Sequence, residues 1–138
     1  MASSIDRDGI LEGICAILDR IDEIDIAYVY GSFLNRDDFR DIDIAIHISR
    51  EMPPYQRFKF SQRIARDLEH GAEPKIDFDV RILNYAPPYF QYEVICKGIL
   101  MLERDEERRV DYEAHLISEY LDLKYMYDSL DKAFLARA

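Results

Sequence analysis

The chain has 138 residues, about half of them hydrophobic and a third charged, with a formal net charge of −10. This length suits one domain with a substantial core and excludes two domains of ordinary size. The acidic balance excludes strong non-specific attraction to nucleic acid and favours basic protein partners and divalent cations. No apolar run is long enough to cross a membrane and no secretory signal is visible at the start, so we expect a cytoplasmic protein without membrane contacts.

The predicted elements alternate between helices and short strands. In the first helix, Ile10, Ile14 and Ile17 recur at helical spacing. We expect helices over residues 5–20, 53–70, 87–97 and 105–137, of which the third is short and the last is long. We expect strands over residues 24–30, 41–48, 76–83 and 99–103, of which the last is short. This order predicts one domain over residues 1–138, of α/β or α+β class, with helices flanking a small mixed sheet.

Segment 41–48 alternates strictly between isoleucine and other residues. Isoleucine occupies every second position, which predicts a strand with one buried face. The other face carries Asp41, Asp43, Ala45 and His47. Asp41 and Asp43 therefore project together about 6.5–7 Å apart, where their carboxylates can share two hard cations. We interpret His47, further along that face, as a structural or surface residue.

Gly31 and Ser32 directly follow the strand predicted over 24–30. Glycine allows the backbone to approach a phosphate without a Cβ clash, and Ser32 can donate its hydroxyl. The strand over 76–83 carries Asp77 and Asp79 on one face, and either can supply a third carboxylate. Two metal ions held in this way can bind a nucleoside triphosphate, lower the pKa of an attacking hydroxyl and stabilise the leaving pyrophosphate.

This spacing of residues resembles a known family. Gly31 and Ser32, followed after eight residues by Asp41 and Asp43 and later by Asp79, resemble the minimal nucleotidyltransferases of the polymerase-β-like superfamily. The stretches 30–44 and 78–87 resemble the branch that acts as antitoxins paired with HEPN-domain toxins, which are small helical ribonucleases. The resemblance covers nearly the whole chain. It implies a nucleotidyltransferase-like fold and the Mg²⁺-dependent transfer of AMP from ATP to a tyrosine hydroxyl of the toxin.

The resemblance also implies roles for individual residues. Gly31 and Ser32 would hold the triphosphate of ATP. Asp41 and Asp43 would bind both of two Mg²⁺ ions. Asp79 would be the third catalytic and metal-binding carboxylate, near the incoming tyrosine hydroxyl, and Asp77 is the weaker candidate for that role.

Two arginines near these positions are further candidates. Arg40 lies in the loop that precedes Asp41, and we predict that it contacts the nucleotide. Arg81 shares the face of Asp79 and could orient that carboxylate or a phosphate. The loop between Ser32 and Asp41 is shorter than is common in the family, which would narrow the nucleotide pocket.

The terminal helix carries two apolar stripes. One consists of Val110, Ala114, Ile117, Leu121 and Tyr125, and the other of Tyr112, Leu116, Tyr120, Leu123, Tyr127, Leu130 and Phe134. One stripe suffices to dock the helix on the sheet. The second either lies buried in a groove or forms a homo- or hetero-oligomeric interface, for which tyrosine is well suited.

Two alternatives to the AMP-transferring enzyme remain open. One is an antitoxin that neutralises its toxin by complex formation alone, and the other is a transferase for a small molecule.

The two cysteines, Cys15 and Cys96, have no predicted chemical role. Neither belongs to a CxxC pair, and each lies in an apolar helical pattern. We therefore expect both to be buried as small hydrophobic residues. Together with three scattered histidines they give no zinc signature.

Overall fold

The computed structural model describes residues 6–72 and 75–136. Within them the elements are α1 (Arg7–Asp19), β1 (Ile24–Tyr30), η1 (Ser32–Leu34), β2 (Asp41–Ile48), α2 (Pro54–Gly71), β3 (Asp77–Ile82), η2 (Leu83–Tyr85), α3 (Pro88–Lys97), β4 (Ile99–Glu103) and α4 (Glu106–Ala136). The predicted order of helices and strands is confirmed, with the two 3₁₀ turns η1 and η2 added. The predicted helix boundaries at residues 5 and 137 lie outside the described residues.

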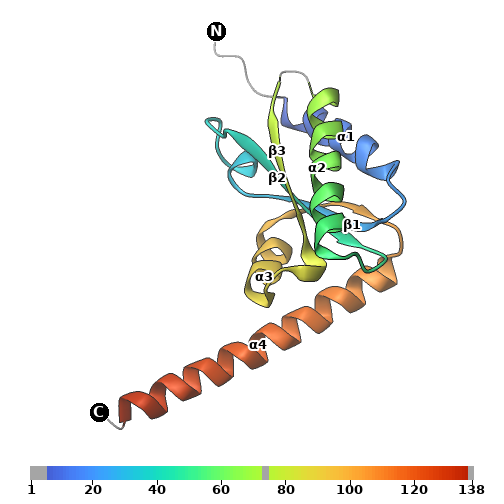
Figure 1. Cartoon of the computed structure of the whole chain (residues 1–138). Coiled ribbons are helices and arrows are strands. Elements are labelled where there is room, and N and C mark those ends of the chain that lie inside the picture. The colour runs from blue at the N-terminus through green and yellow to red at the C-terminus, as the bar shows by residue number, and fades with distance from the viewer. Residues whose placement is uncertain (1–5, 73–74, 137–138) are drawn as a thin grey trace.

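The sheet is mixed and has the strand order β3-β2-β1-β4. Strand β1 pairs antiparallel with both β2 and β4, whereas β2 pairs parallel with β3. The parallel pair requires a crossover, which α2 provides, as Figure 1 shows. The prediction of an α+β fold with a small mixed sheet is therefore confirmed, and β2, which carries Asp41 and Asp43, lies inside the sheet.

One face of the sheet is covered by α1 and α2. The isoleucines of β2 are fully buried there and pack with Leu18 of α1 and with Ile64 and Leu68 of α2. The strict alternation in 41–48 thus gives the buried face that the sequence predicts. The carboxylates of β2 consequently point to the opposite face.

The opposite face is only partly covered. A smaller core forms there around Tyr28 of β1, Ala45 of β2 and Val94 of α3. Helix α3 contacts β1 on one side and α4 on the other. Asp41 and Asp43, nearer the start of β2, stay half-buried beyond this core, so this end of the face remains accessible.

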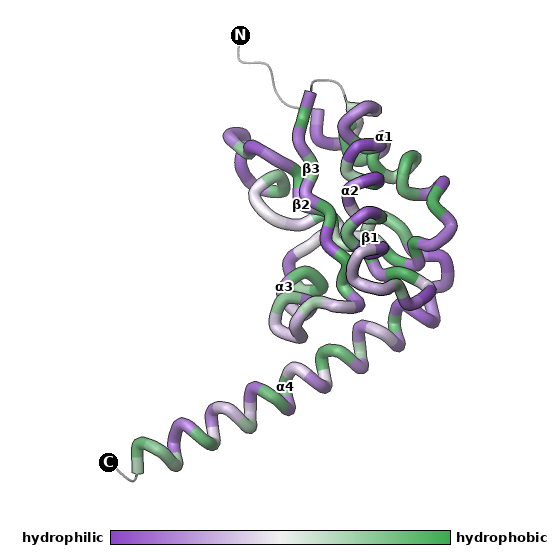
Figure 2. Tube along the Cα trace, viewed as in Figure 1, coloured by the Kyte–Doolittle hydropathy of each residue, from purple (hydrophilic) through white to green (hydrophobic). Residues whose placement is uncertain are grey.

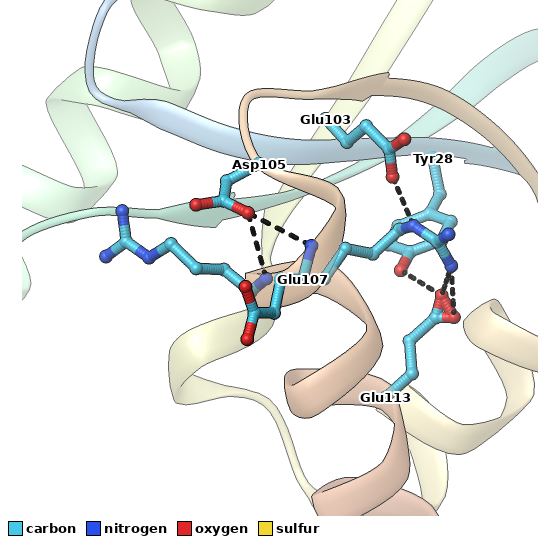
Figure 3. Close-up of polar contacts among 7 residues, drawn as sticks. Tyr28, Glu103, Asp105, Glu107 and Glu113 are labelled. Carbon is cyan, nitrogen blue, oxygen red and sulfur yellow. Dashed lines mark hydrogen bonds and ion pairs between the residues drawn. The ribbon is translucent and has the colours of Figure 1, made fainter.

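The first turns of α4 are held by a polar cluster, drawn in Figure 3. Asp105 caps the helix by accepting hydrogen bonds from two backbone N–H groups of its first turn, at 3.0 and 3.3 Å. Arg109 pairs with both Glu103 and Glu113, and the hydroxyl of Tyr28 donates to Glu113 at 3.3 Å. This cluster fixes the direction in which α4 leaves the domain.

Beyond this cluster α4 leaves the domain, as Figure 1 shows. Leu116 is its one buried residue within the described part of the helix, and the side chains from Lys124 to Ala136 are all exposed. The alternative that both apolar stripes are buried in a groove is therefore wrong, because α3 leaves the side chains beyond Leu123 exposed. No helix in the described residues combines the length and the apolar character needed to cross a bilayer.

The prediction that both cysteines are buried is also wrong. Cys96 is exposed, because α3 buries Gln91 and Val94 and Cys96 lies on the opposite side of that helix. Cys15 is half-buried, and its thiol donates to the carbonyl of Met101 at 3.3 Å.

Candidate active site

The parallel pairing of β2 and β3 places four carboxylates side by side. Asp41 lies opposite Asp77, and Asp43 lies opposite Asp79. Residues opposite one another point to the same face, so all four share the accessible face. Asp41, Asp43 and Asp79 are half-buried, whereas Asp77 is exposed. Burial therefore favours Asp79 over Asp77 as the partner of the Asp41–Asp43 pair.

The turn after β1 lies directly against Asp43. Gly31 has a φ of +85°, a conformation that favours glycine. A Cβ atom at this position would clash with the carboxylate of Asp43. Ser32, the next residue, is half-buried and begins η1. The backbone of this turn and the carboxylate of Asp43 thus form one compact unit that a larger residue at 31 would disrupt.

Negative charge accumulates at Asp43. Burial, and then the neighbouring charges of Asp41 and Asp79, raise the pKa of Asp43 from its usual 3.8 to about 6, while Arg81 acts in the opposite direction. Burial and the charge of Asp43 likewise raise the pKa of Tyr30. A site with this excess of negative potential favours a bound cation.

The carboxylates fit Mg²⁺ as a partly open site. Among residues 6–72 and 75–136, no three His, Cys, Asp or Glu side chains gather closely enough to hold a metal ion by themselves. Magnesium at nucleotide sites usually takes one or two protein carboxylates and completes its shell with substrate phosphates and water. The carboxylates of Asp41 and Asp43, together with the crowding of charge described above, match that donor set.

A cavity of about 380 Å³ lies near the carboxylates, although none of the four aspartates lines it. Arg81 connects the two, because its Nε lies 3.3 Å from the Asp79 carboxylate and its side chain also lines the cavity. The guanidinium lies 5.4 Å from the ring centre of Phe90, which in turn meets Tyr30 edge-on at 5.5 Å. Arg81 was predicted from the sequence, whereas Tyr30 and Phe90 were not. The available signals for these two were the alternation in β1 and the Pro-Pro start of α3.

The loop between Ser32 and Asp41 is tied down by Arg7 of α1. The Arg7 guanidinium donates to the carbonyls of Phe33 and Arg36 at 2.9 and 2.7 Å, and to Asp37 at 2.9 Å. Arg40 is exposed and makes no side-chain hydrogen bond or ion pair within the described residues. Its predicted contact with a nucleotide stays a prediction.

His47 lies at the other end of this face. Its ring packs against Tyr112 of α4, with the ring centres 4.6 Å apart, and its Nδ1 lies 3.5 Å from Asp25. Burial is the largest influence on its pKa and lowers it. This environment joins β2 to α4, which fits the structural role predicted for His47.

The mixed sheet, the Gly-Ser turn and the paired carboxylates are the features expected of a domain that binds a nucleoside triphosphate and transfers its nucleotidyl group. The sequence pattern of the family described as "Polymerase beta, Nucleotidyltransferase" matches residues 12–107. The chain therefore belongs to the polymerase β nucleotidyltransferase family, which confirms the resemblance seen in the sequence. No curated protein matches the chain.

Solved structures with the same fold include toxin–antitoxin complexes. The chain is similar to one chain of the tri-AMPylated Shewanella oneidensis HEPN toxin in complex with MNT antitoxin (19% identity, TM-score 0.67, covering 93% of this chain and 98% of that one). It is equally similar to a chain of the toxin–antitoxin MntA–HepT (19%, 0.67, 94% and 99%). A third similar chain belongs to a toxin–antitoxin structure with AMP-PNP (21%, 0.68, 91% and 98%). At these identities the likeness establishes the fold.

Proposed function

We propose that this chain is an antitoxin that transfers AMP from ATP to a tyrosine hydroxyl of a HEPN-domain toxin and so silences it. The observation that carries this proposal is the packing of Gly31 against Asp43, with Asp41 and Asp79 beside it. The reaction uses ATP, so we propose the cytoplasm as its location.

The proposed partner and nucleotide are supported by the similar structures. One contains an AMPylated HEPN toxin with its MNT antitoxin, and another contains the ATP analogue AMP-PNP. The chain covers nearly the whole length of the matched chains, and its net charge of −10 suits a basic protein partner.

In the proposed reaction, the tyrosine oxygen forms a bond to the α-phosphorus of ATP. The bond from that phosphorus to the bridging oxygen of the β-phosphate breaks, pyrophosphate leaves, and the phenolic proton passes to solvent. Asp41, Asp43 and Asp79 would hold Mg²⁺ together with phosphate oxygens of ATP and water, and Gly31 and Ser32 would hold the triphosphate. With Mg²⁺ bound, the triphosphate charge is neutralised and the attacking hydroxyl becomes more acidic.

Intact-protein mass spectrometry tests this proposal. The chain is mixed with Mg²⁺, ATP and a purified HEPN-domain protein, using wild type and Asp43→Asn in parallel. We expect the HEPN protein to gain one or more AMP masses only with the wild-type chain. Replacing Mg²⁺ by EDTA should abolish the gain in mass, which tests whether the transfer depends on the metal ion.

A second candidate function is neutralisation by complex formation alone. The observation that favours it is the exposed apolar surface of α4 beyond Lys124. It predicts that Asp43→Asn still forms a stable complex with the toxin and still inhibits its ribonuclease activity without any AMP transfer. A wild-type chain that binds and inhibits the HEPN protein without adding AMP would replace the first proposal by this one.

A further inference from the structure

The distal half of α4 exposes large apolar side chains that its own domain does not cover. These residues are Leu121, Tyr125, Met126, Tyr127, Leu130, Phe134 and Leu135. Figure 2 shows hydrophobic and hydrophilic positions alternating along this part of the helix. Large exposed apolar side chains gathered on one helix of a protein domain mark an interaction site, and their spacing places them on more than one side of α4.

One side of this helix forms a groove with the start of α3. The groove encloses about 470 Å³. Its walls are prolines and tyrosines of the α3 start and apolar residues of α4, chiefly Pro87, Pro88, Tyr89, Tyr120, Leu123 and Tyr127. Tyr120 is also stacked on Tyr92 of α3, with ring centres 4.1 Å apart. Rigid aromatic and proline walls bind a partner with little loss of side-chain entropy.

The groove meets the cavity that Arg81 lines. Pro87 and Tyr89 line both this groove and the 380 Å³ cavity. The same cavity is lined by Arg81, which pairs with Asp79. Only this cavity therefore lies between a chain segment bound in the groove and the site where AMP transfer is proposed.

We propose that this groove, with the adjoining face of α4, docks the protein that accepts the nucleotidyl group. This inference rests on the proposed function. The occupant presents an apolar or aromatic side chain to the tyrosine-lined groove, from a surface with net positive charge. Two copies of this chain would bring together two charges of −10, whereas a basic acceptor is attracted.

Two tyrosines on α4 provide a matched pair of variants. Tyr127 lines the groove, whereas Tyr125 lies two residues earlier, about 200° around the helix axis. Their exposed fractions are 60% and 76%, so truncating either leaves the core intact. We expect Tyr127→Ala to weaken binding of the HEPN-domain protein about tenfold or more, and Tyr125→Ala to change it less than about threefold.

The measurement is isothermal titration calorimetry without nucleotide, followed by transfer kinetics with ATP and Mg²⁺. Tyr127→Ala should raise the KM for the HEPN protein while leaving kcat unchanged, because the groove holds the acceptor and does not touch the reacting atoms. Asp43→Asn should bind the HEPN protein as tightly as wild type. Because binding is measured without nucleotide, docking is tested separately from transfer.

Three results would overturn the docking proposal. They are no binding by the wild-type chain, equal effects of the two tyrosine variants, and a wild-type homodimer that Tyr127→Ala converts to monomers, which would make a second copy the occupant. Binding that depends on Tyr127 without any transfer of AMP would support the docking groove and refute the proposed function.

Discussion

The carboxylate end of the sheet and the distal half of α4 are held in opposite ways. Asp41 and Asp43 lie on an internal strand whose isoleucines are buried beneath α1 and α2. The α4 residues beyond Lys124 have no such support and are exposed on every side. The comparison shows that the groups proposed for chemistry are fixed by sheet register, whereas the surface proposed for recognition projects from the domain to meet a partner.

The largest expected effect separates two carboxylates of the same strand. Asp79→Asn should lower the rate of AMP transfer by about 10²–10³, whereas the exposed Asp77→Asn should change it by less than about threefold. Single-turnover transfer measured by mass spectrometry compares the two variants directly. Equal losses in both would mean that the half-burial of Asp79 does not distinguish its role.

A glycine pair tests how tightly the turn fits the carboxylate. Gly31→Ala should destabilise the fold by about 1–3 kcal/mol, because the residue keeps a positive φ and its Cβ meets Asp43. Gly13→Ala, in α1 with open space around its Cβ, should instead stabilise by about 0.5–1 kcal/mol. Urea denaturation of both variants measures the difference, and a neutral Gly31→Ala would contradict the close packing.

The anchor of α4 can be weakened by removing one oxygen atom. The hydroxyl of Tyr112 donates to Oε1 of the buried Gln91 at 2.6 Å. Tyr112→Phe should therefore cost about 1–2 kcal/mol of stability, since Gln91 loses a partner away from water. Tyr125→Phe, at an exposed position of the same helix, should leave the melting temperature unchanged.

The charge crowding at Asp43 predicts a pH dependence in metal-free buffer. Because folding raises its pKa to about 6, the stabilising contribution of Asp43 is full below its usual pKa of 3.8 and is lost as the pH rises through 6. At neutral pH, Asp43→Asn should therefore be more stable than wild type by about 1 kcal/mol, after allowance for solvent screening. Thermal melts with EDTA at several pH values test this. The difference in stability between Asp43→Asn and wild type should disappear at low pH.

The smallest effect is expected at the end of α4. Truncating the chain after Lys124 should change the free energy of unfolding by less than about 0.5 kcal/mol, because the side chains from Tyr125 to Ala136 are exposed. Leu116→Ala, at the buried position of the same helix, should cost about 2–4 kcal/mol. A large loss on truncation would show that the distal half supports the domain.

The sequence predicted the elements well where a strong local pattern was present. The alternation in 41–48 identified β2 and its buried face, because a strand places alternate residues on opposite sides. The two stripes of α4 and the exposed Cys96 were less predictable, because a helical pattern does not say how far neighbouring elements reach.

By itself, the sequence determined the fold class, the faces of β2 and β3, and the Gly-Ser turn, since these depend on local periodicity and on the conformational freedom of glycine. Only the tertiary structure decided that Asp43 lies beside Asp79, because the α2 crossover sets the parallel register. It also decided that α3 covers part of that face and brings Phe90 next to Arg81 and Tyr30. Contacts between distant segments depend on packing, which local sequence patterns do not encode.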